Sequence, residues 1–145
     1  MSDTPSSASL RLSLPELAAF LDEAFPAEAR PLLGTLLSVE PGHVRMMIDP
    51  LPAMLRPGGL ISGPIQMGLV DVAAYAVILA HAGPVAMAVT NSLSISFLRG
   101  AKASRLHADA RLLKLGRRLA SVDVRLWQDS EDRLIAQSTV GYALP

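Results

Sequence analysis

Residues 63–81 read GPIQMGLVDVAAYAVILAH, and this stretch decides the fold. Its early proline favours the first turn of a helix, because the missing N–H would have no partner there. Apolar residues continue around nearly all sides of the expected helix, so other parts of the chain must cover it. The apolar run contains Gln66 and Asp71 and is shorter than the roughly 20 residues of a membrane span. We therefore expect a buried central helix at residues 64–81.

The chain before this helix predicts a tail, a first helix and two strands. Residues 1–9 are small, polar and proline-containing, which is typical of a disordered tail. Ser13 and Glu16 have the spacing of a capping box at a helix start, and Pro26 or Pro31 ends that helix. Two strands joined by a turn follow at residues 33–39 and 44–48.

A loop rich in proline and glycine, residues 50–63, leads into the central helix. After the helix, four segments alternate apolar and polar residues, as antiparallel strands with one covered face do. In the first of them, strict alternation puts Thr90 on the face opposite Leu93. The order α-β-β-α-β-β-β-β predicts a single α+β domain at residues 10–145, with an antiparallel sheet wrapped around one long helix. The four segments are residues 87–98, 105–112, 120–127 and 134–142.

Composition excludes several classes of function. The chain has 145 residues, of which 50% are hydrophobic, and this is enough for the core of one domain. Thirteen Lys and Arg balance thirteen Asp and Glu, so the basic surplus of a nucleic-acid binder is missing. There is no cysteine, and the three histidines lack metal-ligand spacing, so we expect no disulfide, thiol nucleophile or metal site. The first residues do not resemble a signal peptide. We expect a cytoplasmic protein that binds neither nucleic acid nor membrane.

Three motifs within residues 32–142 carry a family resemblance. They read SGPIQMGLVD at 62–71, VTNSLSISFLRGA at 89–101, and GRRLA with LIAQST at 116–120 and 134–139. In order and spacing they resemble the hotdog-fold thioesterases, in the PaaI-like branch of the 4-hydroxybenzoyl-CoA thioesterase superfamily. Gly63 and the helix carboxylate Asp71 match the family pattern. Ser62 stands where the family usually has histidine, Pro64 replaces a glycine, and Arg56 falls where many relatives have asparagine.

The resemblance implies an acyl-CoA thioesterase, which hydrolyses a thioester to a carboxylic acid and free CoA without a cofactor. It gives Asp71 the role of nucleophile or general base. It gives the N–H of Gly63, at the helix start, the role of donor to the thioester oxyanion. Thr90 lies where relatives often carry serine or threonine near the attacking water. Apart from the resemblance, Asp71 interrupts an apolar helix, and a buried carboxylate needs either structural partners or a task.

The other candidate residues are expected to bind the substrate. Gln66 lies about one helical turn before Asp71, Arg56 lies in the loop, and Ser62 also fits a helix cap. We expect four basic residues at the ends of adjacent strands, where they would bind the phosphates of coenzyme A. The alternative is that they are ordinary surface charges. These four are Arg99, Lys102, Arg117 and Arg118.

The resemblance also implies a homodimer or a dimer of dimers, with Gly63 of one subunit facing Asp71 of the other. A hydratase of the same fold needs a histidine paired with a carboxylate, and no histidine lies in the candidate loop or next to Asp71. The changes at Ser62 and Pro64 keep a second function open, a non-catalytic protein that binds acyl-CoA or lipid. A scaffold protein that binds neither is a third alternative.

Overall fold

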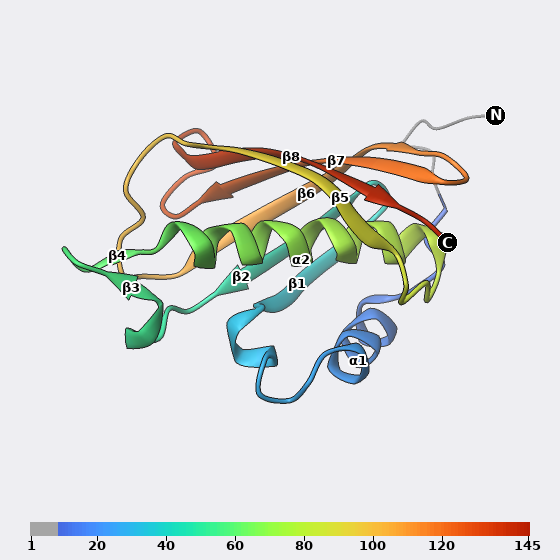
Figure 1. The fold of residues 1–145 in the computed structure, drawn as a ribbon, viewed down its shortest axis with the longest axis horizontal. Helices are drawn as coiled ribbons and strands as arrows, with labels where there is room; N and C mark the ends of the chain where they lie inside the picture. Colours follow the sequence, from blue (N-terminus) through green and yellow to red (C-terminus); the bar gives the residue numbers. More distant parts are fainter. Residues whose placement is uncertain (1–8) are drawn as a thin grey trace.

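The computed structural model describes residues 9–145, so nearly all of the tail expected at 1–9 lies outside the described residues. A six-stranded antiparallel sheet, in the order β1-β2-β6-β7-β8-β5, curves around one long helix (Figure 1). This confirms the α+β hotdog architecture and the predicted order of the main elements. The helices are α1 (Leu14–Ala24) and α2 (Gly63–Ala82). The strands of the sheet are β1 (Thr35–Glu40), β2 (His43–Ile48), β5 (Val89–Phe97), β6 (Leu106–Leu115), β7 (Leu119–Trp127) and β8 (Leu134–Ala143).

The central helix α2 begins and ends where local chemistry dictates. The side chain of Ser62 accepts a hydrogen bond from the N–H of Ile65 at 3.4 Å, which makes Ser62 the N-cap. Gly83 follows the last turn with φ of +92°, a conformation that favours glycine. By length and composition α2 could cross a membrane, but 72% of its most apolar 18-residue stretch is buried inside this domain. It is the core helix that the sequence predicts.

The first helix also follows its capping signal. Ser13 and Glu16 form both halves of a capping box, with bonds of 3.3 and 2.9 Å. Leu17 and Leu21 are fully buried and fix α1 beside β1 and α2. The segment between α1 and β1 contains the short 3-10 helix η2 (Arg30–Leu32).

The loop expected at residues 50–63 contains more structure than predicted. It holds a 3-10 helix, η3 (Pro52–Met54), and a small hairpin of β3 (Leu55–Arg56) and β4 (Leu60–Ile61). Two-residue strands are too short to show the alternation by which strands are recognised in a sequence. The hairpin places Arg56 and Leu60 beside the start of α2.

A β-bulge in β5 corrects the predicted face of Thr90. Thr90 pairs with Tyr142 and Ser92 pairs with Gly141, so Asn91 is an extra residue between the two pairs. The bulge turns Thr90 to the inner face of the sheet, the same face as Leu93. Gly141 is required opposite the bulge, since a Cβ there would lie 2.6 Å from Oδ1 of Asn91.

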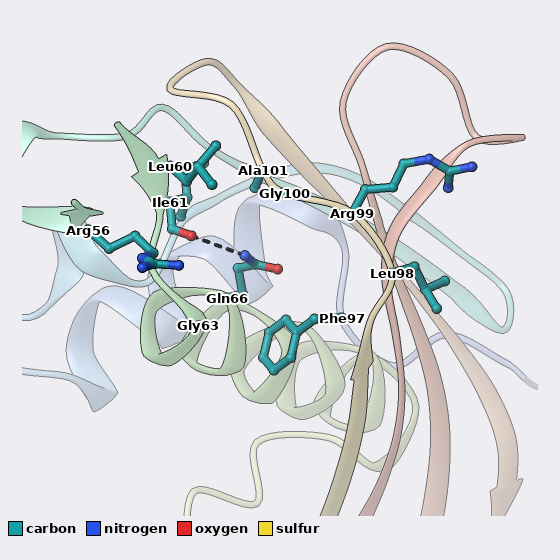
Figure 2. A pocket seen from close by; sticks show the side chains of 10 residues that line it. All are labelled: Arg56, Leu60, Ile61, Gly63, Gln66, Phe97, Leu98, Arg99, Gly100 and Ala101. Carbon is teal, nitrogen blue, oxygen red and sulfur yellow. Dashed lines mark hydrogen bonds between the residues drawn. The ribbon is translucent and has the colours of Figure 1, made fainter. Parts of the chain in front are cut away.

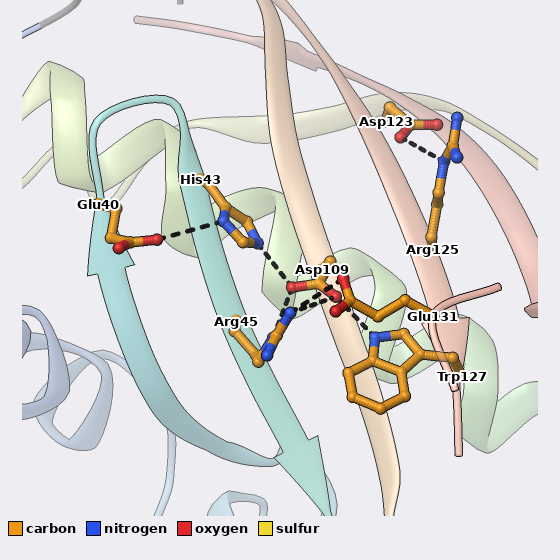
Figure 3. Close-up of polar contacts among 8 residues, drawn as sticks. All are labelled: Glu40, His43, Arg45, Asp109, Asp123, Arg125, Trp127 and Glu131. Atoms are coloured by element: carbon orange, nitrogen blue, oxygen red, sulfur yellow. Dashed lines mark hydrogen bonds and ion pairs between the residues drawn. The ribbon is translucent and has the colours of Figure 1, made fainter. Parts of the chain in front are cut away.

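The outer face of the sheet carries a buried carboxylate, Asp109 of β6 (Figure 3). Its Oδ1 accepts bonds from His43 at 2.6 Å and from Arg45 at 2.8 Å, and its Oδ2 accepts the indole N–H of Trp127 at 2.6 Å. Nη2 of Arg45 lies 3.1 Å from Oε1 of Glu131 and also donates to Oδ2 of Asp109 at 3.2 Å. Burial alone raises the pKa of Asp109, but the hydrogen bonds from these donors outweigh it and hold the pKa well below its usual range.

We expect Asp109→Asn to lower the free energy of unfolding by about 3 kcal/mol at neutral pH, because the half-buried guanidinium of Arg45 loses its counter-charge. A depressed folded-state pKa stabilises the protein above the ordinary carboxyl value of about 3.9. The difference between wild type and variant should therefore shrink as the pH falls below that value. Urea unfolding at several pH values measures it. Asp22→Asn, at an exposed pair with Arg30, is the matched control, with an expected change below about 1 kcal/mol.

Candidate functional site

The carboxylate of Asp71 lies on the inner face of the sheet, between α2 and the strand pair β5–β8. Its Oδ1 accepts two hydrogen bonds, from the hydroxyl of Thr90 at 2.6 Å and from the phenol of Tyr142 at 2.7 Å. Its Oδ2 accepts none from residues 9–145. Asp71 is only half-buried, so one of its oxygens is held by the protein and the other is free for a reactant.

A mainly apolar cavity of about 560 Å³ surrounds this carboxylate. Tyr75 stacks on Tyr142 with ring centroids 6.0 Å apart, and Phe25 meets Tyr75 edge-on at 5.8 Å. Among the described residues that line the cavity, only Asp71, Tyr75, Thr90 and Tyr142 have polar side chains. Its lining comes from the end of α1, the segment before β1, α2, the start of β5 with the residues before it, and β8. The lining residues are Ala24, Phe25, Leu33, Gly68, Asp71, Val72, Tyr75, Ala86, Met87, Ala88, Val89, Thr90 and Tyr142.

Tyr142 is the contact of Asp71 that sequence reasoning missed. It is 4% exposed, and its hydroxyl also lies 3.1 Å from the backbone oxygen of Asp71. Burial is the main cause that raises the pKa of the Tyr142 phenol far above its usual range, and the charge of Asp71 adds to it. The phenol is therefore a permanent donor. In the sequence Tyr142 is one apolar position of an alternating strand, which gives no sign of a polar task.

A second cavity, of about 470 Å³, lies at the start of α2 (Figure 2). No acceptor among residues 9–145 binds the N–H of Gly63, so this amide can donate to a ligand at the positive end of the helix. A Cβ at position 63 would lie 3.4 Å from the ring of Phe97, which is ordinary van der Waals contact, so Gly63 lies beside this ring. Arg56 and Arg99 also line this cavity.

Gln66 points its amide oxygen into the same region. The side chain is 4% exposed, and its Nε2 donates to the carbonyl of Ile61 at 3.2 Å, which fixes the orientation of the amide. Its Oε1 has no partner in the part of the chain that the structure describes. Ser62, in contrast, is accounted for as the helix cap.

The structure of one chain separates the two halves of the expected site. Gly63 and Asp71 lie on one helix, eight residues apart, which corresponds to about 12 Å along the axis. They line two different cavities. Thr90, Tyr142 and Asp71 are brought together, and Gly63, Gln66 and Arg56 form the second group.

The four basic residues expected together lie at two ends of the sheet. Arg99 and Lys102 follow β5 and line a third cavity of about 330 Å³ with Arg133, which sequence reasoning missed. Arg117 and Arg118 belong to the turn between β6 and β7, at the opposite end (Figure 1). Within one chain these two pairs cannot bind the same phosphate. Among the described residues, no group of three His, Cys, Asp or Glu side chains could hold a metal ion.

Fold and site together define a hotdog protein with a carboxylate facing an apolar cavity. Residues 58–135 match the family model of the thioesterase superfamily. The chain belongs to this superfamily. None of the curated proteins compared with it matches significantly.

Three solved structures are similar to the chain; the first two support the assignment, and the third shows the fold alone. A protein named as a candidate thioesterase from a Silicibacter species is 35% identical, with a TM-score of 0.87, and the match covers 100% of this chain and 99% of that one. Zebrafish thioesterase superfamily member 2 is 25% identical, with a TM-score of 0.80 over 92% of this chain and 99% of that one. The Escherichia coli PaaI protein, from the phenylacetic acid degradation operon, is 20% identical, with a TM-score of 0.72 over 88% and 94%.

Proposed function

We propose that the chain is an acyl-CoA thioesterase whose catalytic carboxylate is Asp71. The observation that carries the proposal is the arrangement of this carboxylate: two hydroxyl groups hold Oδ1, and Oδ2 is open at the wall of an apolar cavity. A carboxylate on the core helix costs free energy unless it has a task or full pairing, and the pairing is incomplete. Thioesterase chemistry is that of the superfamily, and the acyl-CoA substrate is our proposal.

The proposal includes a dimer through the edge of the sheet. β5 is an edge strand of the sheet, and none of the described residues pairs with the backbone on its outer edge. Val89 and Phe97, at its two ends, are 54% and 49% exposed. One stripe of α2 is also uncovered: Pro64, Met67, Gly68 and Asp71, at helical spacing, are exposed or half-exposed. A second copy of the chain, added antiparallel along β5, would cover both surfaces.

Such pairing would complete the site. In antiparallel self-pairing, Phe97 of one copy lies opposite the Val89 end of the other. Gly63 lies beside the ring of Phe97, and Asp71 accepts a hydrogen bond from Thr90. Gly63 of one copy would therefore face Asp71 of the other. The same two-fold axis would bring Arg99 and Lys102 of one copy to the same edge as the basic turn 117–118 of its partner.

The chemistry then uses groups from both copies. The N–H of Gly63 donates to the thioester oxygen, on which negative charge develops. As general base, Asp71 takes one proton of a water molecule on Oδ2 while the water oxygen bonds to the carbonyl carbon. The carbon–sulfur bond then breaks, and the thiolate receives the proton, which yields the carboxylic acid and CoA. As nucleophile, Oδ2 itself bonds to the carbonyl carbon and displaces the thiolate, and water then cleaves the mixed anhydride.

The alternative is an acyl-CoA or lipid binder without turnover. The observation that favours it is Ser62, which occupies the histidine position of the family and serves as the cap of α2. A binder would use the same two cavities, and the unpartnered Oε1 of Gln66 would accept a hydrogen bond from the ligand.

Asp71→Asn should lower kcat at least ~100-fold with little change in folding or dimerisation, because the loss of an acid–base group has this scale. Thiol release from a panel of short, medium, long and aryl acyl-CoA esters measures it. Circular dichroism and size-exclusion chromatography are the controls. Unchanged turnover in the variant would remove Asp71 from the mechanism. Saturable binding without turnover in the wild type would establish the alternative function.

Mixed dimers test the shared site. We expect Asp71→Asn and Gly63→Pro to inactivate separately, the latter because proline removes the N–H. In a mixed dimer, one site combines the intact Gly63 of one copy with the intact Asp71 of the other. Random mixing of equal amounts of the two inactive proteins after unfolding and refolding should recover about a quarter of the wild-type rate, since half of the dimers then hold one intact site of two. No recovery contradicts the shared site.

The binding of CoA phosphates by Arg99 and Lys102 can be tested with two esters of the same acyl group. The change of Arg99 and Lys102 to alanine should raise KM about tenfold for acyl-CoA and leave it unchanged for the same acyl group on N-acetylcysteamine, because only the CoA ester carries phosphates. Arg30→Ala, at an ion pair away from both cavities, is the matched loss of a cation. Equal effects of the double variant on both esters would refute the phosphate contact.

A further inference from the structure

The polar contacts of Asp71 point to a residue beyond those that the proposed function requires. Tyr142 and Thr90 approach Asp71 from different strands, β8 and β5, and both donate to the same oxygen, Oδ1. The two donors differ in how they are held. Tyr142 is 4% exposed and is fixed by its stacking on Tyr75, whereas Thr90 lies at the exposed edge strand.

We propose that Tyr142 is the positioning residue that holds the Asp71 carboxylate by Oδ1 and so selects Oδ2 as the oxygen that reacts. This inference rests on the proposed function of Asp71. A carboxylate with two equivalent free oxygens rotates about its bond to Cβ, and every rotation moves the reactive lone pair away from the substrate. The hydrogen bond from the phenol to Oδ1, at 2.7 Å, opposes this rotation. The phenol oxygen also lies 3.1 Å from the backbone oxygen of Asp71, so it is held close to that residue. A misplacement of about 1 Å can cost 100-fold in rate.

The bulge and the glycine opposite it serve the same geometry. Asn91 is the extra residue that turns Thr90 toward Asp71, and Gly141 leaves the space that Asn91 and Ser92 fill. Gly141 directly precedes Tyr142 in β8. One local irregularity therefore sets both donors at hydrogen-bond distance from Oδ1.

The ionisable groups around the carboxylate are few. Of the residues that line this cavity, only Tyr75 of α2 and Tyr142 of β8 can ionise besides Asp71. The hydroxyl of Tyr75 donates to the backbone oxygen of Ala86 at 3.0 Å and not to Asp71. Burial raises the pKa of both phenols, so both remain protonated donors at and below neutral pH. No histidine and no second carboxylate among the described residues lines this cavity.

The test is the pH dependence of kcat/KM in Tyr142→Phe. A hydrogen bond donated to a carboxylate favours the charged form, so its loss should move the acid limb about one pH unit higher. At neutral pH, kcat should fall about tenfold, because the carboxylate is less well positioned. KM should change less than twofold, since the ring and its contacts with the cavity are kept. Thermal unfolding at each pH ensures that the measured limb is not loss of the fold.

Three further variants keep the test decisive. Thr90→Val removes the other donor to Oδ1 and should move the limb in the same direction, and Thr90→Ser should restore it. This pair replaces Tyr142→Phe if that variant fails to fold. Tyr75→Phe removes a phenol hydroxyl from the same stack and, whatever its effect on KM, should leave the limb in place.

The outcomes separate the two proposals. A limb that stays in place in Tyr142→Phe and in Thr90→Val, while Asp71→Asn is inactive, overturns the role of Tyr142 and retains Asp71 as the base or nucleophile. An equal shift in Tyr75→Phe also overturns it, because the effect is then a general one of the aromatic stack. Full turnover of Asp71→Asn overturns both proposals.

Discussion

The central constraint is that α2 is apolar around almost its whole circumference, so its surface must be covered from every side. The sheet covers it with alternating inward residues of β2, β6 and β7, of which Val44, Ala108 and Val124 are fully buried. α1 closes another side through Leu17 and Leu21. The stripe from Pro64 to Asp71 is what remains open. This stripe adjoins the unpaired edge strand β5. The part of α2 that is left unburied is therefore also the place of the proposed site.

The same periodicity explains which parts of the structure the sequence could predict. A helix with apolar residues on all sides and strands with period-two alternation are strong signals, and a single charge within such a helix is conspicuous. Asp71 was found in this way, and Gly63 by its place at the helix start. The capping serines at positions 13 and 62 follow from their spacing to the first turn. In each case the signal lies within a few residues of the position it describes.

The rest depended on pairings between distant segments. The bulge at Asn91 reversed the face expected for Thr90, and its complement, Gly141, lies 50 residues further along the chain. From the sequence alone, Tyr142 is an ordinary core residue. Its contact with Asp71 becomes visible only when β8 is paired with β5 and packed against α2. The separation of Arg99 from Arg117 follows from strand direction. Arg99 follows β5 and Arg117 follows β6, and these two strands run in opposite directions, so they end at opposite edges of the sheet. The sequence reasoning placed all four basic residues at strand ends without assigning each end to an edge.

Buried and half-buried polar groups on the inner side of the sheet are of two kinds, those with all their partners within the fold and those with one atom left without a partner. His81 accepts the N–H of Gly42 and contacts the carbonyl of Val77, and the hydroxyl of Ser138 donates to the backbone of Ser94. These groups have their partners within the fold, as buried polar groups require. Oε1 of Gln66 and Oδ2 of Asp71 have none there. Both are acceptors on α2, three and eight residues after its first residue, and both residues line a cavity. Nη1 of Arg30 and Nδ1 of His107 are also buried without a partner among the described residues, so a missing partner alone does not mark a site. What points to a ligand at Gln66 and Asp71 is that each also lines a cavity.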